Sequence, residues 1–161
     1  MNCFLYWYSQ IHSERRLLEA AWHNYEFGER KKALAIAEEL LLKYPKWYQA
    51  RLLRAKIYQE RHLYLLAIDD LNKVIRQVGR AEADWLFQKG WAYAQLYAPR
   101  AALDNFEQAI RLNPKVGNYY GWQAWAKHRL HYPPAQVCAD WQTAQQKGLS
   151  EPKPPRPQVC Q

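Results

Sequence analysis

Glycine and long apolar runs are both scarce in this sequence. The 161 residues include only 6 glycines, and most of the 9 prolines stand in turns or near the end of the chain, so the composition allows long helices. No stretch approaches the roughly 20 apolar residues that a membrane-spanning helix requires. The apolar opening from Asn2 to Tyr8 has no basic lead-in and no small-residue cleavage site, so it does not resemble a secretory signal. We therefore expect a helical protein of the cytoplasm.

Cysteine is also rare. Cys3, Cys138 and Cys160 are widely spaced and form no C-x-x-C pair, so the sequence indicates neither a disulfide framework nor a zinc site. Cys138 stands between Val137 and Ala139 in a helical pattern and is interpreted as a small core residue.

Sequence signals of catalysis are missing as well. The chain has no G-x-S-x-G, no H-E-x-x-H and no phosphate-binding glycine loop. His128 and His131 lack a carboxylate or cysteine partner for a metal site, and Asp69-Asp70 is interpreted as a polar helix face. We expect no enzyme, no bound metal and no cofactor.

Basic residues exceed acidic ones and give a formal net charge of +8. This charge favours an acidic partner, of which nucleic acid is the obvious candidate. However, Lys and Arg are scattered along the chain, and the densest run is only Arg30-Lys31-Lys32. A solvated, solubilising surface is the other interpretation.

One segment carries a spaced pattern of small, aromatic and helix-ending residues. Its members are Gly90, Tyr93, Ala102, Phe106, Ala109 and Pro114. Small residues allow two antiparallel helices to approach, aromatic residues fill the space beside them, and a proline ends the second helix. In these intervals the segment resembles the tetratricopeptide repeat family.

The same pattern recurs along the chain. The small residues Ala21, Ala55, Gly90 and Ala124 follow one another at steps of 34, 35 and 34 residues, which indicates four repeats. The fourth departs most from the family pattern, because Lys127 replaces the expected aromatic residue. The resemblance covers about residues 14 to 148 and depends mainly on residues 83 to 116.

The resemblance implies an all-α fold, a right-handed superhelical solenoid of about four helical hairpins. The expected helices cover residues 12–27, 30–43, 47–60, 64–77, 82–95, 99–112, 116–130 and 134–147. We expect an apolar N-terminal segment or cap at 1–13, the repeat domain at 14–148, and a proline-rich tail at 149–161 that is disordered or extended. Residues 2–10 either extend the first helix, form a separate cap, or dock on a partner or second copy.

In this family the first helix of each hairpin lines a concave groove that holds a peptide. Trp and Tyr dominate binding hot spots, and three tryptophans share one register here. The implied groove residues are Leu18, Trp22, Tyr25, Leu53, Lys56, Phe87, Trp91, Trp122 and Trp125. The alternative is that these side chains pack between repeats or lie under the tail.

Two functions are consistent with the sequence. The first is a protein-interaction module (an adaptor, assembly factor or chaperone) that holds an apolar or aromatic partner segment, with an acidic residue to meet Lys56 or Arg129. The second is a basic helical-repeat protein that binds nucleic acid, whose binding would fall steeply with salt. A homo- or hetero-oligomer is compatible with both.

Overall fold

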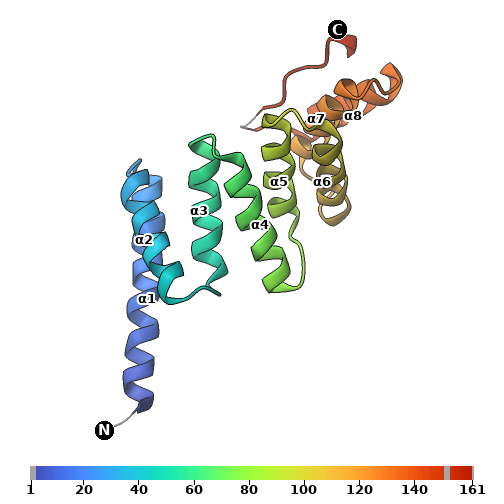
Figure 1. Cartoon of the computed structure of the whole chain (residues 1–161). Helices are drawn as coiled ribbons and strands as arrows, with labels where there is room; N and C mark the ends of the chain where they lie inside the picture. Colours follow the sequence, from blue (N-terminus) through green and yellow to red (C-terminus); the bar gives the residue numbers. More distant parts are fainter. Residues whose placement is uncertain (1–2, 151–152, 161) are drawn as a thin grey trace. The chain divides into compact units, whose positions relative to one another are not determined.

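The structure is a computed structural model that describes residues 3–150 and 153–160, and the side chains of the first helix from residue 14 onward. Eight α-helices and a final 3-10 turn follow one another along these residues, which contain no strand (Figure 1). They are α1 (Cys3–Glu26), α2 (Arg30–Lys43), α3 (Tyr48–Glu60), α4 (Tyr64–Val78), α5 (Ala83–Gln95), α6 (Pro99–Leu112), α7 (Gly117–Arg129), α8 (Pro134–Lys147) and η1 (Gln158–Cys160). The all-helical prediction is confirmed, and α2 to α8 agree with the expected bounds to within one residue at each end.

Helix α1 is longer than the sequence predicted. It begins at Cys3 and runs for 24 residues, whereas the expected helix began at residue 12. Residues 3–11 therefore continue the first helix. The side chains of this stretch lie outside the described residues, so their role as a cap or docking segment stays a prediction.

In each helical hairpin, the turn between the two helices contains a residue with a left-handed backbone conformation. Gly28, His62, Tyr97 and His131 have φ values of 86°, 59°, 54° and 59°, at steps of 34, 35 and 34 residues. In each case the next residue donates its N–H to the carbonyl five residues earlier, at 2.8 to 3.0 Å. This hydrogen bond ends a helix in a Schellman-type cap. Four equivalent turns confirm that the chain repeats one hairpin.

The chain divides into two compact units, Met1–Gly79 and Arg80–Gln161. The first unit contains α1 to α4, and its core gathers fully buried alanines and long aliphatic residues from three helices. These include Ala21, Ala33, Ala37, Leu53 and Ile57, all 0% exposed.

The second unit contains α5 to α8 and the tail. Gly90 of α5 faces the ring of Phe106 on α6, and a Cβ atom added at Gly90 would lie 2.7 Å from that ring. The two helices can approach this closely because glycine has no side chain, as the repeat pattern predicted.

Two interpretations from the sequence are wrong. Cys138 and Cys160 form a disulfide with their Cα atoms 5.3 Å apart, so Cys138 is not simply a core residue. The spacing of 22 residues did not reveal this pair, because it forms only when the tail turns back onto α8. Asp70 does not lie on a polar face either, since it is 1% exposed and accepts two hydrogen bonds from Arg54.

The departure of the fourth repeat at Lys127 has a structural explanation. Lys127 on α7 forms a half-buried ion pair with Asp140 on α8, at 2.7 Å between Nζ and Oδ2. Burial raises the pKa of Asp140 above its ordinary value, and this effect outweighs the opposing hydrogen bond and charge of Lys127. Lysine stands in place of the aromatic residue where the half-buried carboxylate of Asp140 faces this position.

Replacing Lys127 with methionine is expected to destabilise the second unit by about 2 kcal/mol at neutral pH, because Asp140 is left buried without its cation. Because the pKa of Asp140 is higher in the folded than in the unfolded protein, protonation of Asp140 favours folding. This contribution to the free energy of unfolding is complete below the unfolded-state pKa and is lost as the pH rises through the folded-state pKa. The loss caused by Lys127→Met should therefore shrink as the pH falls and Asp140 becomes protonated.

Urea unfolding of both proteins at several pH values measures this difference. Lys115→Met, at an exposed position outside any helix, is the matched control and should change little. A destabilisation by Lys127→Met that stays constant with pH would contradict the assignment.

Candidate functional site

The nine implied groove residues differ in their exposure. Five of them are buried: Leu18, Tyr25, Leu53, Phe87 and Trp122. Lys56 is exposed, and the other three, Trp22, Trp91 and Trp125, are half-buried. These four offer the largest surface to a partner.

The buried members pack inside their own units. Leu18 and Leu53 belong to hydrophobic clusters of the first unit. Phe87 lies 5.0 Å from Tyr119 between ring centroids, and Trp122 lies 6.4 Å from Phe106. For these side chains the structure shows the packing between helices that the sequence left as an alternative.

A cation sits over two aromatic rings in the first unit. The Lys56 ammonium of α3 lies 5.8 Å from the Trp22 ring centroid and 5.2 Å from that of Tyr25, both on α1. Trp22 and Tyr25 meet edge to face at 5.9 Å. We call Trp22, Tyr25 and Lys56 the first-unit cluster. Cation–π contact fixes the Lys56 stem but leaves the exposed ammonium able to meet a carboxylate.

A second cation neutralises the carboxylate beside this cluster. Arg30 on α2 donates to Glu60 on α3 at 2.8 Å, and the Tyr25 hydroxyl donates to the same carboxylate. Burial disfavours the ionised form of Glu60, but these two hydrogen bonds, together with the positive charges of Arg30 and Lys56, outweigh it and hold the pKa of Glu60 below its ordinary value. Arg30 and Tyr25 make the hydrogen bonds to Glu60, while the Lys56 ammonium lies over the two rings.

The second unit has an aromatic pocket of about 380 Å³. Its lining is Ala94, Gln95, Tyr97, Trp122, Trp125 and Pro155, and we call it the second-unit pocket. Trp122 and Trp125 meet edge to face at 5.8 Å, and the Arg129 guanidinium lies 5.9 Å from the Tyr97 ring. The sequence prediction missed Tyr97 and Pro155. Tyr97 could have been found from its position, one repeat step from both His62 and His131.

Solved structures with the same arrangement of helices identify the fold. YrrB, described as a TPR protein with an unusual peptide-binding site, superposes with a TM-score of 0.72 at 18% sequence identity. The match covers 81% of this chain and 66% of YrrB, so this chain spans just under two thirds of the YrrB chain. MamA gives 0.75 at 16% identity over 83% of this chain and 77% of its own. MamA from Desulfovibrio magneticus RS-1 gives 0.68 at 18% identity over 83% and 71%. The chain has the tetratricopeptide repeat fold.

The likeness to these TPR structures is one of fold. No protein-family model matches the sequence, and no curated protein matches it either. Within each unit, the TPR assignment makes α1, α3, α5 and α7 the first helices of the four hairpins. Trp22, Lys56, Trp91 and Trp125 occupy one register position on these helices.

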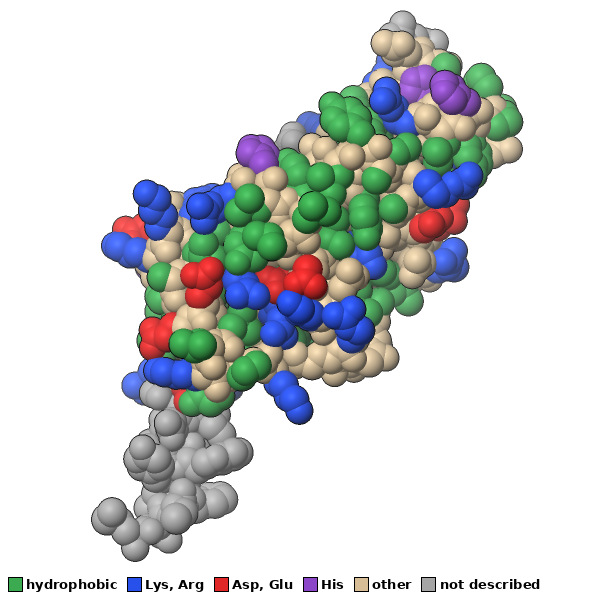
Figure 2. Space-filling view, viewed as in Figure 1, with side chains coloured by type: hydrophobic (Ala, Val, Ile, Leu, Met, Phe, Trp, Pro, Cys, Tyr) green, Lys and Arg blue, Asp and Glu red, His purple; other side chains and the backbone are tan. Residues whose placement is uncertain are grey.

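Many basic side chains of this TPR chain are paired with acidic ones. Figure 2 shows Lys and Arg interspersed with Asp, Glu and hydrophobic side chains on the visible face. Ion pairs join Arg30 to Glu60, Lys73 to Asp69, and Lys127 to Asp140. These pairs place carboxylates among the cations, although the formal net charge of +8 remains.

Neither a metal cluster nor a membrane span is found in the part of the chain that the structure describes. No group of three or more His, Cys, Asp or Glu residues there could hold a metal ion. None of the described helices is both long enough and apolar enough to cross a bilayer.

Proposed function

We propose that this chain is a protein-interaction module that holds extended segments of partner proteins at two separate sites, the first-unit cluster and the second-unit pocket. The observation that carries the proposal is the grouping of accessible aromatic rings with a cation in each unit. Roles as an adaptor, assembly factor or chaperone all fit such a module. YrrB is described as having a peptide-binding site, and its fold is shared with this chain.

The first-unit cluster favours a partner with a carboxylate beside an apolar or aromatic side chain. Trp22 supplies a half-buried face, and the exposed Lys56 supplies the opposite charge. A partner carboxylate that meets Lys56 at a partly desolvated site gains more than it would in open solvent. Because Trp22 contributes apolar contact and Lys56 contributes charge, we expect the dissociation constant of the partner to depend only moderately on salt concentration.

Nucleic acid is the weaker candidate. Aromatic rings can stack on bases, but phosphate contacts dominate the affinity of such complexes. Cations such as Arg30, Arg54 and Lys127 are already held by carboxylates in this structure.

Selection of peptides from a random library against the full chain tests the proposal. We expect selected peptides that combine apolar or aromatic residues with an acidic residue. Lys56→Gln is expected to weaken those that bind the first unit at least about tenfold, as loss of a hot-spot contact does. Trp22→Ala should weaken them as well.

Phe27→Ala is the matched control, because Phe27 is a 73% exposed aromatic outside the cluster. It should leave the dissociation constant unchanged. Lys56→Gln keeps the test sharp, since this exposed residue can be replaced without opening the core. Failure to select any peptide, together with salt-sensitive binding of a single-stranded oligonucleotide, would contradict the proposal and favour nucleic acid.

A further inference from the structure

The tail returns onto α7 and is fixed there by side-chain hydrogen bonds. Asn118 of α7 is 4% exposed and makes two bonds to Ser150. Its amide donates to the Ser150 carbonyl at 2.7 Å, and its oxygen accepts the Ser150 N–H at 2.9 Å. Pro154 and Pro157 are both buried farther along the tail. An extended segment of the chain is therefore held against the first helix of the fourth repeat.

A glycine makes room for this segment. At the same register position the first three repeats have Leu18, Leu52 and Phe87, whereas the fourth has Gly121. A Cβ atom at Gly121 would lie 2.6 Å from Pro154 Cγ. The proline ring thus occupies the space that a large side chain takes in the other repeats.

The tail continues from Pro154 to the edge of the second-unit pocket. Pro155 lines this pocket together with Trp122, Trp125 and Tyr97. Aromatic-lined grooves bind proline-rich segments because an extended proline helix loses little entropy on binding and presents flat rings to aromatic faces. Pro155 borders the cavity of about 380 Å³.

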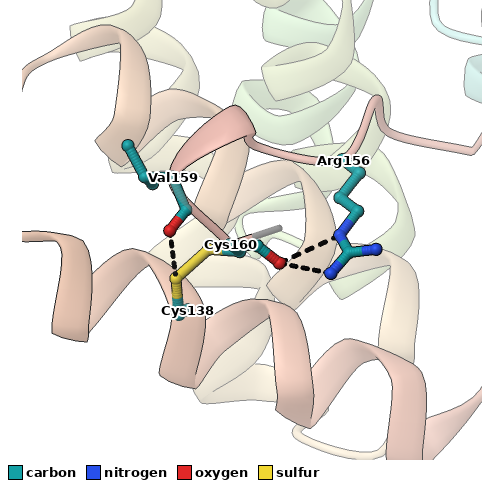
Figure 3. Close-up of a disulfide and its surroundings, with 4 residues drawn as sticks. All are labelled: Cys138, Arg156, Val159 and Cys160. Atoms are coloured by element: carbon teal, nitrogen blue, oxygen red, sulfur yellow. Dashed lines mark hydrogen bonds between the residues drawn. A yellow bond between two sulfur atoms is a disulfide. The ribbon is translucent and has the colours of Figure 1, made fainter.

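The disulfide fastens the end of the tail. Cys160 of η1 is bonded to Cys138 of α8, and Arg156 donates from Nε to the Cys160 carbonyl at 3.0 Å (Figure 3). The Val159 carbonyl oxygen lies 3.4 Å from Cys138 Sγ. Both cysteines are only half-buried, and an open cavity of about 280 Å³ adjoins them. A small reductant can therefore reach the bond.

We infer that the second-unit pocket is a binding site for an extended, proline-containing polypeptide segment, that the tail of this chain lies along it as an intramolecular ligand with Pro155 at its wall, and that the Cys138–Cys160 disulfide keeps the tail in place. This inference deepens the proposed function by naming the ligand class of one of its two sites, and it depends on that function. A partner segment enters when the tail is released.

Release requires a dithiol reductant. One of its thiolates attacks a sulfur of the Cys138–Cys160 bond to form a mixed disulfide, and its second thiol then displaces the protein sulfur. Two electrons and two protons pass to the cysteine sulfurs, and the reductant leaves as a disulfide. The reduced tail remains tethered at an effective concentration on the order of millimolar, so it still competes with a partner.

Titration of the full chain with a synthetic peptide tests this inference. The peptide has the sequence of residues 149–161 with serine in place of Cys160. Four proteins are compared by calorimetry: the oxidised wild type, the reduced wild type, Cys160→Ser, and a tail-disabled variant that carries Pro154→Ser, Pro155→Ser, Pro157→Ser and Cys160→Ser. The tail-disabled variant should bind the peptide. Cys160→Ser and the reduced wild type should bind it roughly tenfold or more weakly, and the oxidised wild type should show no binding.

Trp125→Ala and Gly121→Leu, each made in the tail-disabled variant, should abolish binding while the far-ultraviolet circular dichroism stays unchanged. No binding to the tail-disabled variant, or equal binding to the oxidised wild type, would overturn the inference. So would binding that survives both pocket variants. If library peptides still bind through Trp22 and Lys56 while the tail peptide fails, this inference falls and the proposed function stands; if both fail, both fall.

Discussion

Replacing Asp70 with alanine is expected to lower the free energy of unfolding of the first unit by about 3 kcal/mol. Asp70 on α4 is 1% exposed and accepts hydrogen bonds of 2.8 Å from both Nε and Nη2 of Arg54. The Arg51 side chain, 12% exposed, brings a second guanidinium to 3.6 Å. Removing the carboxylate leaves two poorly hydrated cations side by side, which costs far more than the loss of one surface ion pair.

The neighbouring residue provides a matched control for this prediction. Asp69 precedes Asp70 on the same helix and is paired with Lys73, but both partners are about half exposed. Asp69→Ala should change the free energy of unfolding by less than about 0.5 kcal/mol. Urea unfolding followed by far-ultraviolet circular dichroism measures both variants. Equal effects of the two substitutions would mean that the buried triad contributes no more than an exposed pair.

The helices of this protein could be predicted because each repeat carries its own local signals. Gly90, Ala102 and Pro114 mark close approach and helix ends within about 25 residues, and these intervals are a property of one hairpin. The extension of α1 to Cys3 was not decided by the sequence, because an apolar stretch without a repeat partner is consistent with a helix or a separate cap. The spacing of residues within a repeat therefore predicts the hairpins, but it does not predict the structure at the ends of the chain.

Prediction of the candidate site was less complete. The family register placed the implied groove residues on the first helices of the hairpins, and they do lie there. A register position does not, however, predict the exposed fraction of a side chain. Leu53 is 0% exposed and Phe87 is 8% exposed, although both lie on first helices of hairpins. Lys56 and Trp125, at another register position of these first helices, keep accessible surface. Exposure depends on neighbours that are distant in sequence, which a spacing pattern does not contain.

The sequence analysis left the return of the tail only as an alternative, although the sequence holds a signal for it. Gly117 and Gly121 stand in one predicted helix of a chain that has only 6 glycines. A glycine in a helix interior, such as Gly121, costs about 1 kcal/mol relative to alanine, so its presence there indicates a close approach of another chain segment. The structure supplies such segments: Gly148 lies against Gly117, and Pro154 lies against Gly121.

Replacing Gly117 with alanine is therefore expected to destabilise the second unit by about 3 kcal/mol. A Cβ atom at Gly117 would lie 2.1 Å from the Gly148 carbonyl oxygen and 2.7 Å from that of Ala144. Both atoms belong to the backbone at the end of α8, so no side chain can rotate to relieve the contact. The start of α7 and the end of α8 must separate, which also strains the hydrogen bonds between Asn118 and Ser150.

Helix propensity alone predicts the opposite sign, because Gly→Ala in a helix normally stabilises by up to about 1 kcal/mol. Ala83, the first residue of α5, occupies the equivalent position in the third repeat. Ala83→Gly is the matched control and should cost less than about 1 kcal/mol. Urea unfolding of the two variants decides between propensity and close approach. If Gly117→Ala stabilises the protein, the tail does not return along α7 as described. A large loss of unfolding free energy instead shows that the fourth repeat needs glycine at this position, because the backbone that follows α8 lies against it.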